Sequence, residues 1–196
     1  MIITYVVHVC GMFRIASYRI QRALSSDVLR KIGPKEGIKI HKEIIYAVDI
    51  HRKAMKYCEL LLSSFEGMNM FLIVFGVLSL SLNLFRVFQI MSFGGDIDEF
   101  CMHFTYAFID IVYMFLANYA AQEITNHNDH VFVTTYHVQW YAAPLHIQRM
   151  ILFLLQRGTK TFTITIGGLL IGSMESFTSL ISVSLSYFTV IYSTQN

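Results

Sequence analysis

Three long runs of apolar residues dominate the pattern of hydrophobic and polar positions along the chain. They cover residues 68–91, 101–121 and 162–192, and each contains a single charged side chain. An α-helix rises about 1.5 Å per residue, so about 20 apolar residues cross the roughly 30 Å hydrocarbon core of a bilayer. The three runs therefore predict membrane-spanning helices. The third run is longer than one span needs, and we expect part of it to extend beyond the bilayer.

The apolar stretch at the N-terminus is shorter than these runs. Residues 1–13 have no basic region in front of them and no small-residue cleavage site behind them, which argues against a cleaved signal peptide. The stretch is also too short to cross a bilayer. We expect it to be half of a span, in a chain that begins inside that span.

The polar segment that follows has a helical period. We predict that much of 36–66 is helix, and Pro34 with Gly33 and Gly37 predicts a break between two such helices. Residues three or four apart form the apolar stripe of this helix: Ile40, Ile44, Ala47 and His51, then Ala54, Cys58 and Leu61.

Composition places the chain among membrane proteins. Hydrophobic residues make up 55% of the 196 residues and charged residues 14%, against about 25% charged in an average soluble domain. This excludes a disordered chain and a typical soluble enzyme. The three cysteines are far apart and form no CxxC pair, so no disulfide framework is expected. The predicted fold class is all-α, a multi-pass helical bundle with three full spans, one partial span and long cytoplasmic helical extensions.

The distribution of charge predicts the topology. Residues 14–59 carry eleven of the 15 Lys and Arg residues and only five acids, whereas 92–100 has three acids and no base. Basic segments stay on the cytoplasmic side of a membrane. Residues 14–67 and 122–160 are therefore expected inside, and 92–100 and the C-terminus outside. Few aromatic residues accompany the basic ones, so nucleic acid is not expected as a partner.

The last apolar run has a stripe of small and hydroxyl-bearing residues on one helical face. Bulky apolar residues such as Phe177, Ile181, Leu185 and Phe188 occupy another face. The stripe either packs against other helices, as Gly168 and Gly172 in a GxxxG pattern also would, or it lines water in a pore. The stripe contains Ser179, Val183, Tyr187, Val190 and Thr194, with Ser176 at its start.

Charged residues inside the runs are candidates for function. Asp110 and Glu175 are acids in or beside the membrane, where such residues usually face protein or water. Arg86 could pair with Asp110 near the outer leaflet. Glu175 has an equally good interpretation as a residue at the cytoplasmic interface, where its charge costs little.

No motif for catalysis or metal binding stands out. The four histidines between residues 127 and 146 match no HExxH or compact ligand set, and the chain has no GxSxG, P-loop or GxGxxG sequence. We expect no enzyme activity, no metal and no cofactor.

The C-terminal region resembles that of insect odorant receptors. Trp140-Tyr141 follows the second full span, Arg149 and Arg157 lie in the next helix, and the last span carries Ser186-Tyr187-Phe188 near its end. The segment IHRKAMKYCELLLSSF, with His51, Ala54 and Phe65, is also similar to the family. The resemblance covers nearly the whole chain, although no single motif in it is invariant.

The resemblance implies a subunit of an odorant-gated, non-selective cation channel that assembles with a co-receptor, as a hetero-oligomer expected to be a tetramer. The expected location is the plasma membrane of olfactory sensory neurons, and the ligand a small volatile odorant. A gustatory receptor and a non-channel scaffold or transporter are the alternatives. The implied segments are 1–13 (inner half of span 4), 14–67 (cytoplasmic helices), 68–91 (span 5), 92–100 (extracellular loop), 101–121 (span 6), 122–160 (cytoplasmic anchor), 161–192 (last helix with the pore span) and 193–196 (tail).

The resemblance also assigns roles to residues. It favours pore lining for the stripe and matches Val190 to a hydrophobic gate, while Thr194 is typical of an odorant-tuned subunit rather than the co-receptor. It implies seven spans, so the chain is expected to be N-terminally truncated. It also implies an odorant pocket between spans two, three, four and six, of which only span six is complete here. Two further sets follow: a pocket wall of Tyr106, Asp110 and Tyr113, and subunit contacts at His51, Trp140, Tyr141 and Arg149.

Overall fold

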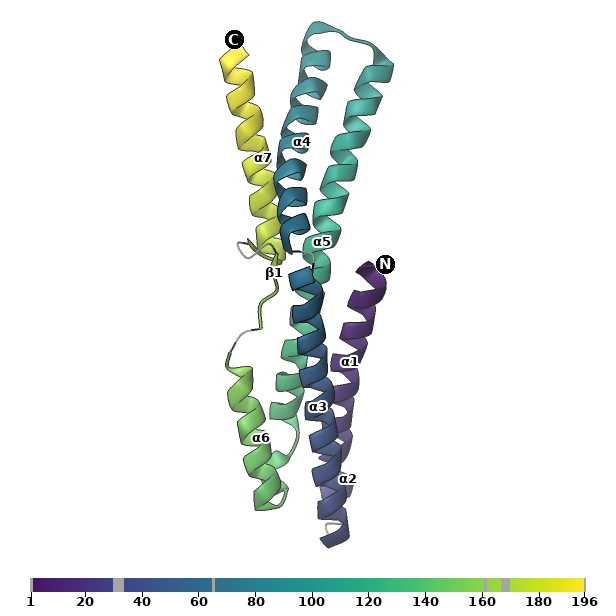
Figure 1. Cartoon of the computed structure of the whole chain (residues 1–196), viewed down its shortest axis with the longest axis vertical. Coiled ribbons are helices and arrows are strands. Elements are labelled where there is room, and N and C mark those ends of the chain that lie inside the picture. The colour runs from purple at the N-terminus through teal and green to yellow at the C-terminus, as the bar shows by residue number, and fades with distance from the viewer. Residues whose placement is uncertain (1, 30–33, 65, 161, 167–169, 196) are drawn as a thin grey trace. The chain divides into compact units, whose positions relative to one another are not determined.

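The computed structural model describes residues 2–29, 34–64, 66–160, 162–166 and 170–195 (Figure 1). Of the residues discussed above, Gly33, Phe65 and Gly168 lie outside this set. The chain divides into two compact units, which are described separately. The amphipathic unit comprises Met1–Ser63 and Glu123–Thr163, and the apolar unit comprises Ser64–Gln122 and Ile164–Asn196.

Helices make up the amphipathic unit. Pro34 begins α3, because proline lacks the N–H that the first helical turn leaves unpaired. Helix α3 confirms that much of 36–66 is helical, and Gly37 lies within this helix rather than in a break. Gly33, the other glycine of the predicted break, lies outside the described residues. The elements are α1 (Ile2–Ala23), α2 (Ser26–Leu29), α3 (Pro34–Ser64), the end of α5 (Ile97–His137), the 3-10 turn η1 (Trp140–Ala142) and α6 (Leu145–Gly158).

The core of the amphipathic unit follows the helical period of its sequence. Phe13 and Ile44 are completely buried, and charged residues of α1 and α3 remain at the surface. Arg19 of α1 donates to Glu43 of α3 at 2.7 Å, a partly exposed pair worth at most about 1 kcal/mol. Burial of the apolar faces therefore holds these helices together. Those faces contain Val9, Phe13, Ala16 and Ile20 in α1, and Ile40, Ile44, Ala47, Ala54 and Cys58 in α3.

Three helices are long and apolar enough to cross a membrane, and they lie wholly or, for α5, mainly in the apolar unit. They comprise Gly67–Phe93 in α4 (Glu66–Phe93), Ile97–His137 in α5 and Met174–Thr194 in α7 (Met174–Gln195). This confirms the three predicted full spans by length and composition. The half span at residues 1–13 is part of α1, which is not among these helices, and it stays a prediction.

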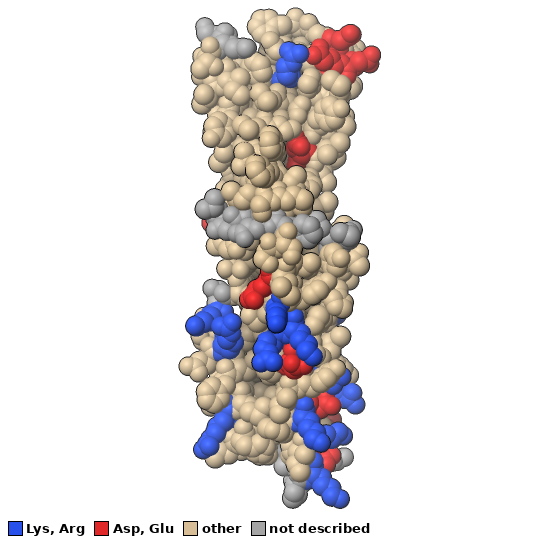
Figure 2. All heavy atoms as spheres, in the orientation of Figure 1, with Lys and Arg blue, Asp and Glu red and all other residues tan. Residues whose placement is uncertain are grey.

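Little of the apolar unit is buried inside it. One buried cluster in it contains Val77 of α4, Met114 of α5 and Leu180 of α7. Large apolar side chains such as Phe71 and Phe75 are 68% and 64% exposed, as suits helices that face lipid. Figure 2 shows Lys and Arg gathered on the amphipathic unit, whereas the visible face of the apolar unit carries few charged residues, which are mainly acidic.

The last helix is shorter than predicted. We expected it over 161–192, but α7 begins at Met174, and β1 (Thr165–Ile166) and β2 (Leu170–Ile171) pair antiparallel before it. The β-branched residues of this segment favour strands over a helix. Ser173 then caps α7, since its Oγ accepts the N–H of Ser176 at 3.1 Å. Gly172 precedes the helix, so it cannot form a helical GxxxG contact.

Candidate functional site

The helix α7 packs on α4 through a different face from the one that carries the predicted stripe. Ser184 is buried, and its carbonyl accepts the hydroxyl of Ser81 of α4 at 3.0 Å. Towards the C-terminal end, Phe88 of α4 makes edge contacts with Phe188 and Tyr192, with ring centroids 5.8 and 5.0 Å apart. These contacts fix the rotation of α7 about its own axis.

All five residues of the stripe are exposed. Val183 is 44%, Tyr187 52% and Val190 57% exposed, and Ser179 and Thr194 are exposed as well. The hydroxyls of the stripe bond back to α7 itself: Ser179 donates to the carbonyl of Glu175 at 3.0 Å, and Thr194 to that of Ile191 at 2.9 Å. The stripe is therefore a continuous surface of α7 that the other helices of the apolar unit leave open.

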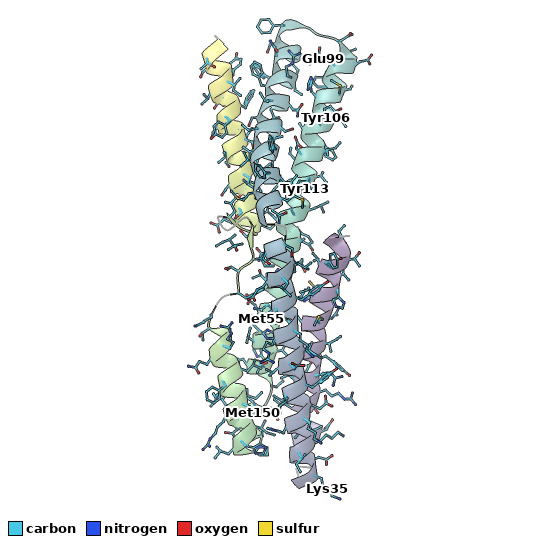
Figure 3. The ribbon with its side chains drawn as sticks, in the orientation of Figure 1. Lys35, Met55, Glu99, Tyr106, Tyr113 and Met150 are labelled. Atoms are coloured by element: carbon cyan, nitrogen blue, oxygen red, sulfur yellow. The ribbon has the colours of Figure 1, made fainter. Side chains whose placement is uncertain are left out.

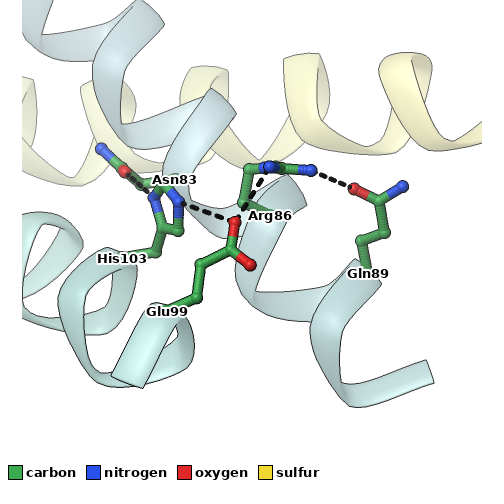
Figure 4. A network of polar contacts seen from close by, with 5 residues as sticks. All are labelled: Asn83, Arg86, Gln89, Glu99 and His103. Atoms are coloured by element: carbon green, nitrogen blue, oxygen red, sulfur yellow. Dashed lines mark hydrogen bonds and ion pairs between the residues drawn. The ribbon is translucent and has the colours of Figure 1, made fainter. Parts of the chain in front are cut away.

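Asp110 and Arg86 do not pair with each other. The Asp110 carboxylate accepts the hydroxyl of Ser79 of α4 at 2.7 Å. Arg86 donates instead to Glu99 of α5 at 3.0 Å (Figure 4). The expected Arg86–Asp110 pair is thus wrong. Glu99 lies in the first turn of α5, within reach of the Arg86 guanidinium.

Polar side chains link Glu99 to Asp110 along the contact between α4 and α5. His103 lies 4.0 Å from Glu99, and its Nδ1 lies 2.9 Å from the amide oxygen of Asn83. Asn83 in turn donates to the Ser79 hydroxyl at 3.3 Å, and Ser79 donates to Asp110. We call this series of contacts the polar ladder. It connects, in order, Arg86, Glu99, His103, Asn83, Ser79 and Asp110. It satisfies polar groups that would otherwise face lipid.

The three predicted wall residues lie on one side of α5. Tyr106 and Tyr113 are 52% and 48% exposed and lie on α5 in the apolar unit (Figure 3). Asp110 is half-buried between them along the helix, at the edge of the contact with α4. The structure therefore brings the three side chains to one surface, which other helices of the apolar unit leave open.

His51 is buried in the core of the amphipathic unit. It is 4% exposed, its Nε2 lies 2.9 Å from the Asn128 amide oxygen, and its ring contacts Phe13 and Phe132 at 5.3 Å each. Burial lowers the pKa of His51; the hydrogen bond to Asn128 opposes this, and the charge of Arg157 adds to it. Any contribution of His51 to subunit contact must act through the helices that it joins.

Trp140 and Tyr141 form the turn η1 between α5 and α6. Their ring centroids are 6.3 Å apart, and Tyr141 is 67% exposed. Gln148 of α6 donates to the carbonyls of Tyr141 and Ala143 at 2.8 Å each, which fixes the turn against the start of α6. Arg149 is exposed on α6. The turn and Arg149 thus offer aromatic and cationic groups at the surface.

Within the described part of the chain, no group of three or more His, Cys, Asp or Glu residues gathers as a metal site. His127 lies 3.8 Å from Glu123, one helical turn away. His130 lies 3.3 Å from the hydroxyl of Ser17, which is 4% exposed and donates to Thr134. Such a buried hydroxyl has the environment of a packing contact rather than of a nucleophile.

The comparison with known proteins then decides the family. The profile of the 7tm odorant receptor family matches residues 1–185. The chain belongs to the odorant receptor family. Odorant receptor 10 of Aedes albopictus is 22% identical over 160 residues, which are 82% of this chain and 42% of that protein. Odorant receptor Or2 of Anopheles gambiae is 27% identical over 158 residues, which are 80% and 38% of the two chains.

A solved structure shares the fold of this odorant receptor chain. The insect olfactory receptor OR5 of Machilis hrabei, in complex with eugenol, superposes with a TM-score of 0.74 at 16% identity. The match covers 96% of this chain and 45% of that one. The odorant receptor chain therefore spans less than half the length of these relatives.

Sequence reasoning missed the polar partners in this odorant receptor chain. Asn128 was not singled out, although Ile124, Asn128, Val131 and Thr135 recur at helical spacing and are all buried. A polar residue in phase with an apolar stripe was the available signal for a buried hydrogen bond. Ser79 and Asn83 gave no such signal, because a span that is apolar all round has no marked face.

Proposed function

We propose that this odorant receptor chain contributes a subunit to an odorant-gated, non-selective cation channel, formed with a co-receptor in the plasma membrane of olfactory sensory neurons. The exposed stripe of α7 carries the proposal. A channel needs a membrane helix whose small or hydroxyl-bearing face is free of its own subunit, and α7 has one.

The proposed topology rests on charge. Residues 14–67 and 122–160 lie in the cytoplasm, and 92–100 and the tail 193–196 lie outside, because the Lys and Arg residues concentrate in the first two segments. In the span order of the odorant receptor family, spans four, five and six then correspond to residues 1–13, 68–91 and 101–121. The pore span is the helix from Met174, and the β1–β2 hairpin precedes it.

The proposed ligand and partner surfaces follow from the same correspondence with the odorant receptor family. Tyr106, Asp110 and Tyr113 form one wall of a pocket for a small volatile odorant, supported by their shared open surface on α5. Tyr141 and Arg149, with Trp140 beside them, contact neighbouring subunits, supported by the exposure of Tyr141 and Arg149. Aromatic and arginine side chains are enriched at such contacts.

Substituted cysteines test the pore-facing stripe. Val190→Cys and Thr189→Cys are each made in a Cys101→Ser background and expressed with the co-receptor. The two residues are adjacent and both exposed, yet a helix turns by about 100° between them. We expect a membrane-impermeant thiol reagent to modify position 190 and leave position 189 unmodified. Equal modification of both, or modification of position 189 alone, contradicts a pore role for the stripe.

A charge substitution gives a second readout of the same helix. Val190→Glu should change the ion permeability of the current that the chain and co-receptor carry together, since a carboxylate in a narrow pore attracts cations. Thr189→Glu is the matched control at the same depth. Currents of unaltered size and selectivity in Val190→Glu would count against the proposed pore.

A further inference from the structure

Two histidines from distant parts of the sequence meet in the amphipathic unit. His41 of α3 and His146 of α6 have ring centroids 5.7 Å apart, with their planes inclined by 56°. The Nδ1 of His41 is buried without a hydrogen-bond partner, and it is the one buried side-chain nitrogen or oxygen of this kind among the described residues. His146 is exposed.

A buried ring nitrogen without a partner calls for a physical explanation. The large majority of buried polar side-chain atoms in proteins have at least one partner, and a bound water or ion is one explanation of an exception. A neutral imidazole offers one lone pair as acceptor or metal ligand. The orphan nitrogen of His41 and the adjacent ring of His146 are thus suited to a ligand that accepts lone pairs from both.

The distance between the rings fits one metal ion. Imidazole nitrogen binds Zn²⁺ at about 2.0–2.1 Å, which puts the centre of the ring about 3.2 Å from the ion. Two rings on one ion then have centroids about 5.2 Å apart at a tetrahedral angle and about 6.4 Å apart on opposite sides. The observed 5.7 Å lies between these limits. His146 is exposed, so its ring has room to turn a nitrogen towards a shared ion.

The donor set selects the class of ion. Imidazole suits Zn²⁺, Cu²⁺ and Ni²⁺, whereas Ca²⁺ and Mg²⁺ require oxygen ligands. No third His, Cys, Asp or Glu joins the pair among the described residues, so water completes the coordination. We propose that His41 and His146 form a two-histidine site for a divalent transition metal ion. The ion ties the start of α6 to the start of α3, and its binding does not depend on channel activity.

Copper titration of the full chain, purified in detergent and freed of metal, tests the site. We expect one Cu²⁺ ion per chain with two nitrogen ligands in its electron paramagnetic resonance spectrum, and displacement by Zn²⁺. His146→Ala should weaken this binding at least tenfold without disturbing the fold, because His146 is exposed. His41→Ala should do the same. His130→Ala is the matched control, an exposed histidine of the same unit, and should leave the affinity unchanged.

Thermal unfolding supplies an independent readout. An ion that binds only the folded chain raises its melting temperature. Zn²⁺ should raise the melting temperature of the wild type and of His130→Ala, but not that of His146→Ala. Equal copper affinity in the wild type and His146→Ala, or a spectrum with one nitrogen ligand, would overturn the proposal. Because neither measurement uses ionic current, loss of the site and loss of the channel are distinguishable.

Discussion

Removal of the Asn128 amide should destabilise the amphipathic unit. His51 is 4% exposed and Asn128 1% exposed, so Asn128→Ala leaves the Nε2 of His51 buried without the partner that lies 2.9 Å away. An orphaned buried polar group costs about 1–3 kcal/mol. At about 2–4 °C per kcal/mol for a chain of this size, the melting temperature should fall by roughly 2–12 °C.

The only tryptophan reports this loss. Trp140 lies in the amphipathic unit, and its fluorescence in detergent at neutral pH follows unfolding there. Val133→Ala, at a 53% exposed position of the same helix α5, is the control and should change the melting temperature by less than about 2 °C. An Asn128→Ala chain that melts together with the wild type would refute the argument that the His51–Asn128 hydrogen bond stabilises this core.

Three further outcomes follow from the described contacts. Burial lowers the pKa of His51, so below about pH 6.5 the unfolded chain takes up a proton that the folded chain resists. The free energy of unfolding should therefore fall as the pH drops from 7 towards about 5. His51→Phe should make the free energy of unfolding less dependent on pH in the same fluorescence assay. Glu99→Gln removes one charge from a half-exposed pair with Arg86 that is worth at most about 1 kcal/mol. The melting temperature should therefore drop by less than about 4 °C in the same assay. Burial raises the pKa of the Cys58 thiol to about 12, so a maleimide at pH 7.5 should modify exposed Cys101 and spare Cys58, and mass spectrometry of digested peptides measures both.

The long helices of this odorant receptor chain were predictable because their physical causes are local. A run of apolar residues predicts a span from its length alone, and the buried faces of α1 and α3 repeat every three or four residues. Pro34 marks the start of α3 for an equally local reason. The segment before α7 was misjudged because its residues are apolar enough for a span; only its β-branched residues and Ser173 indicate strands and a helix cap.

Partners distant in sequence could not be predicted. Arg86 meets Glu99 rather than Asp110, and Asp110 meets Ser79, since rotation of α4 against α5 selects the pairs and the apolar sequence of α4 does not specify that rotation. The same holds for His41 and His146, which only the packing of α6 on α3 brings together. Such contacts belong to tertiary structure, which periodicity along one helix does not encode.

The hydroxyls of α7 bear on the two interpretations of its stripe. A stripe that packs on another helix commonly uses its hydroxyls for bonds between helices, as Ser81 does when it donates to the carbonyl of Ser184. On the exposed stripe, Ser179 and Thr194 donate to carbonyls of α7 itself, as buried Ser184 also does. Each hydroxyl oxygen still has lone pairs available, and such oxygens attract water and cations. The surface that α7 leaves open can thus accommodate water without loss of any bond within the helix, as the proposed pore requires.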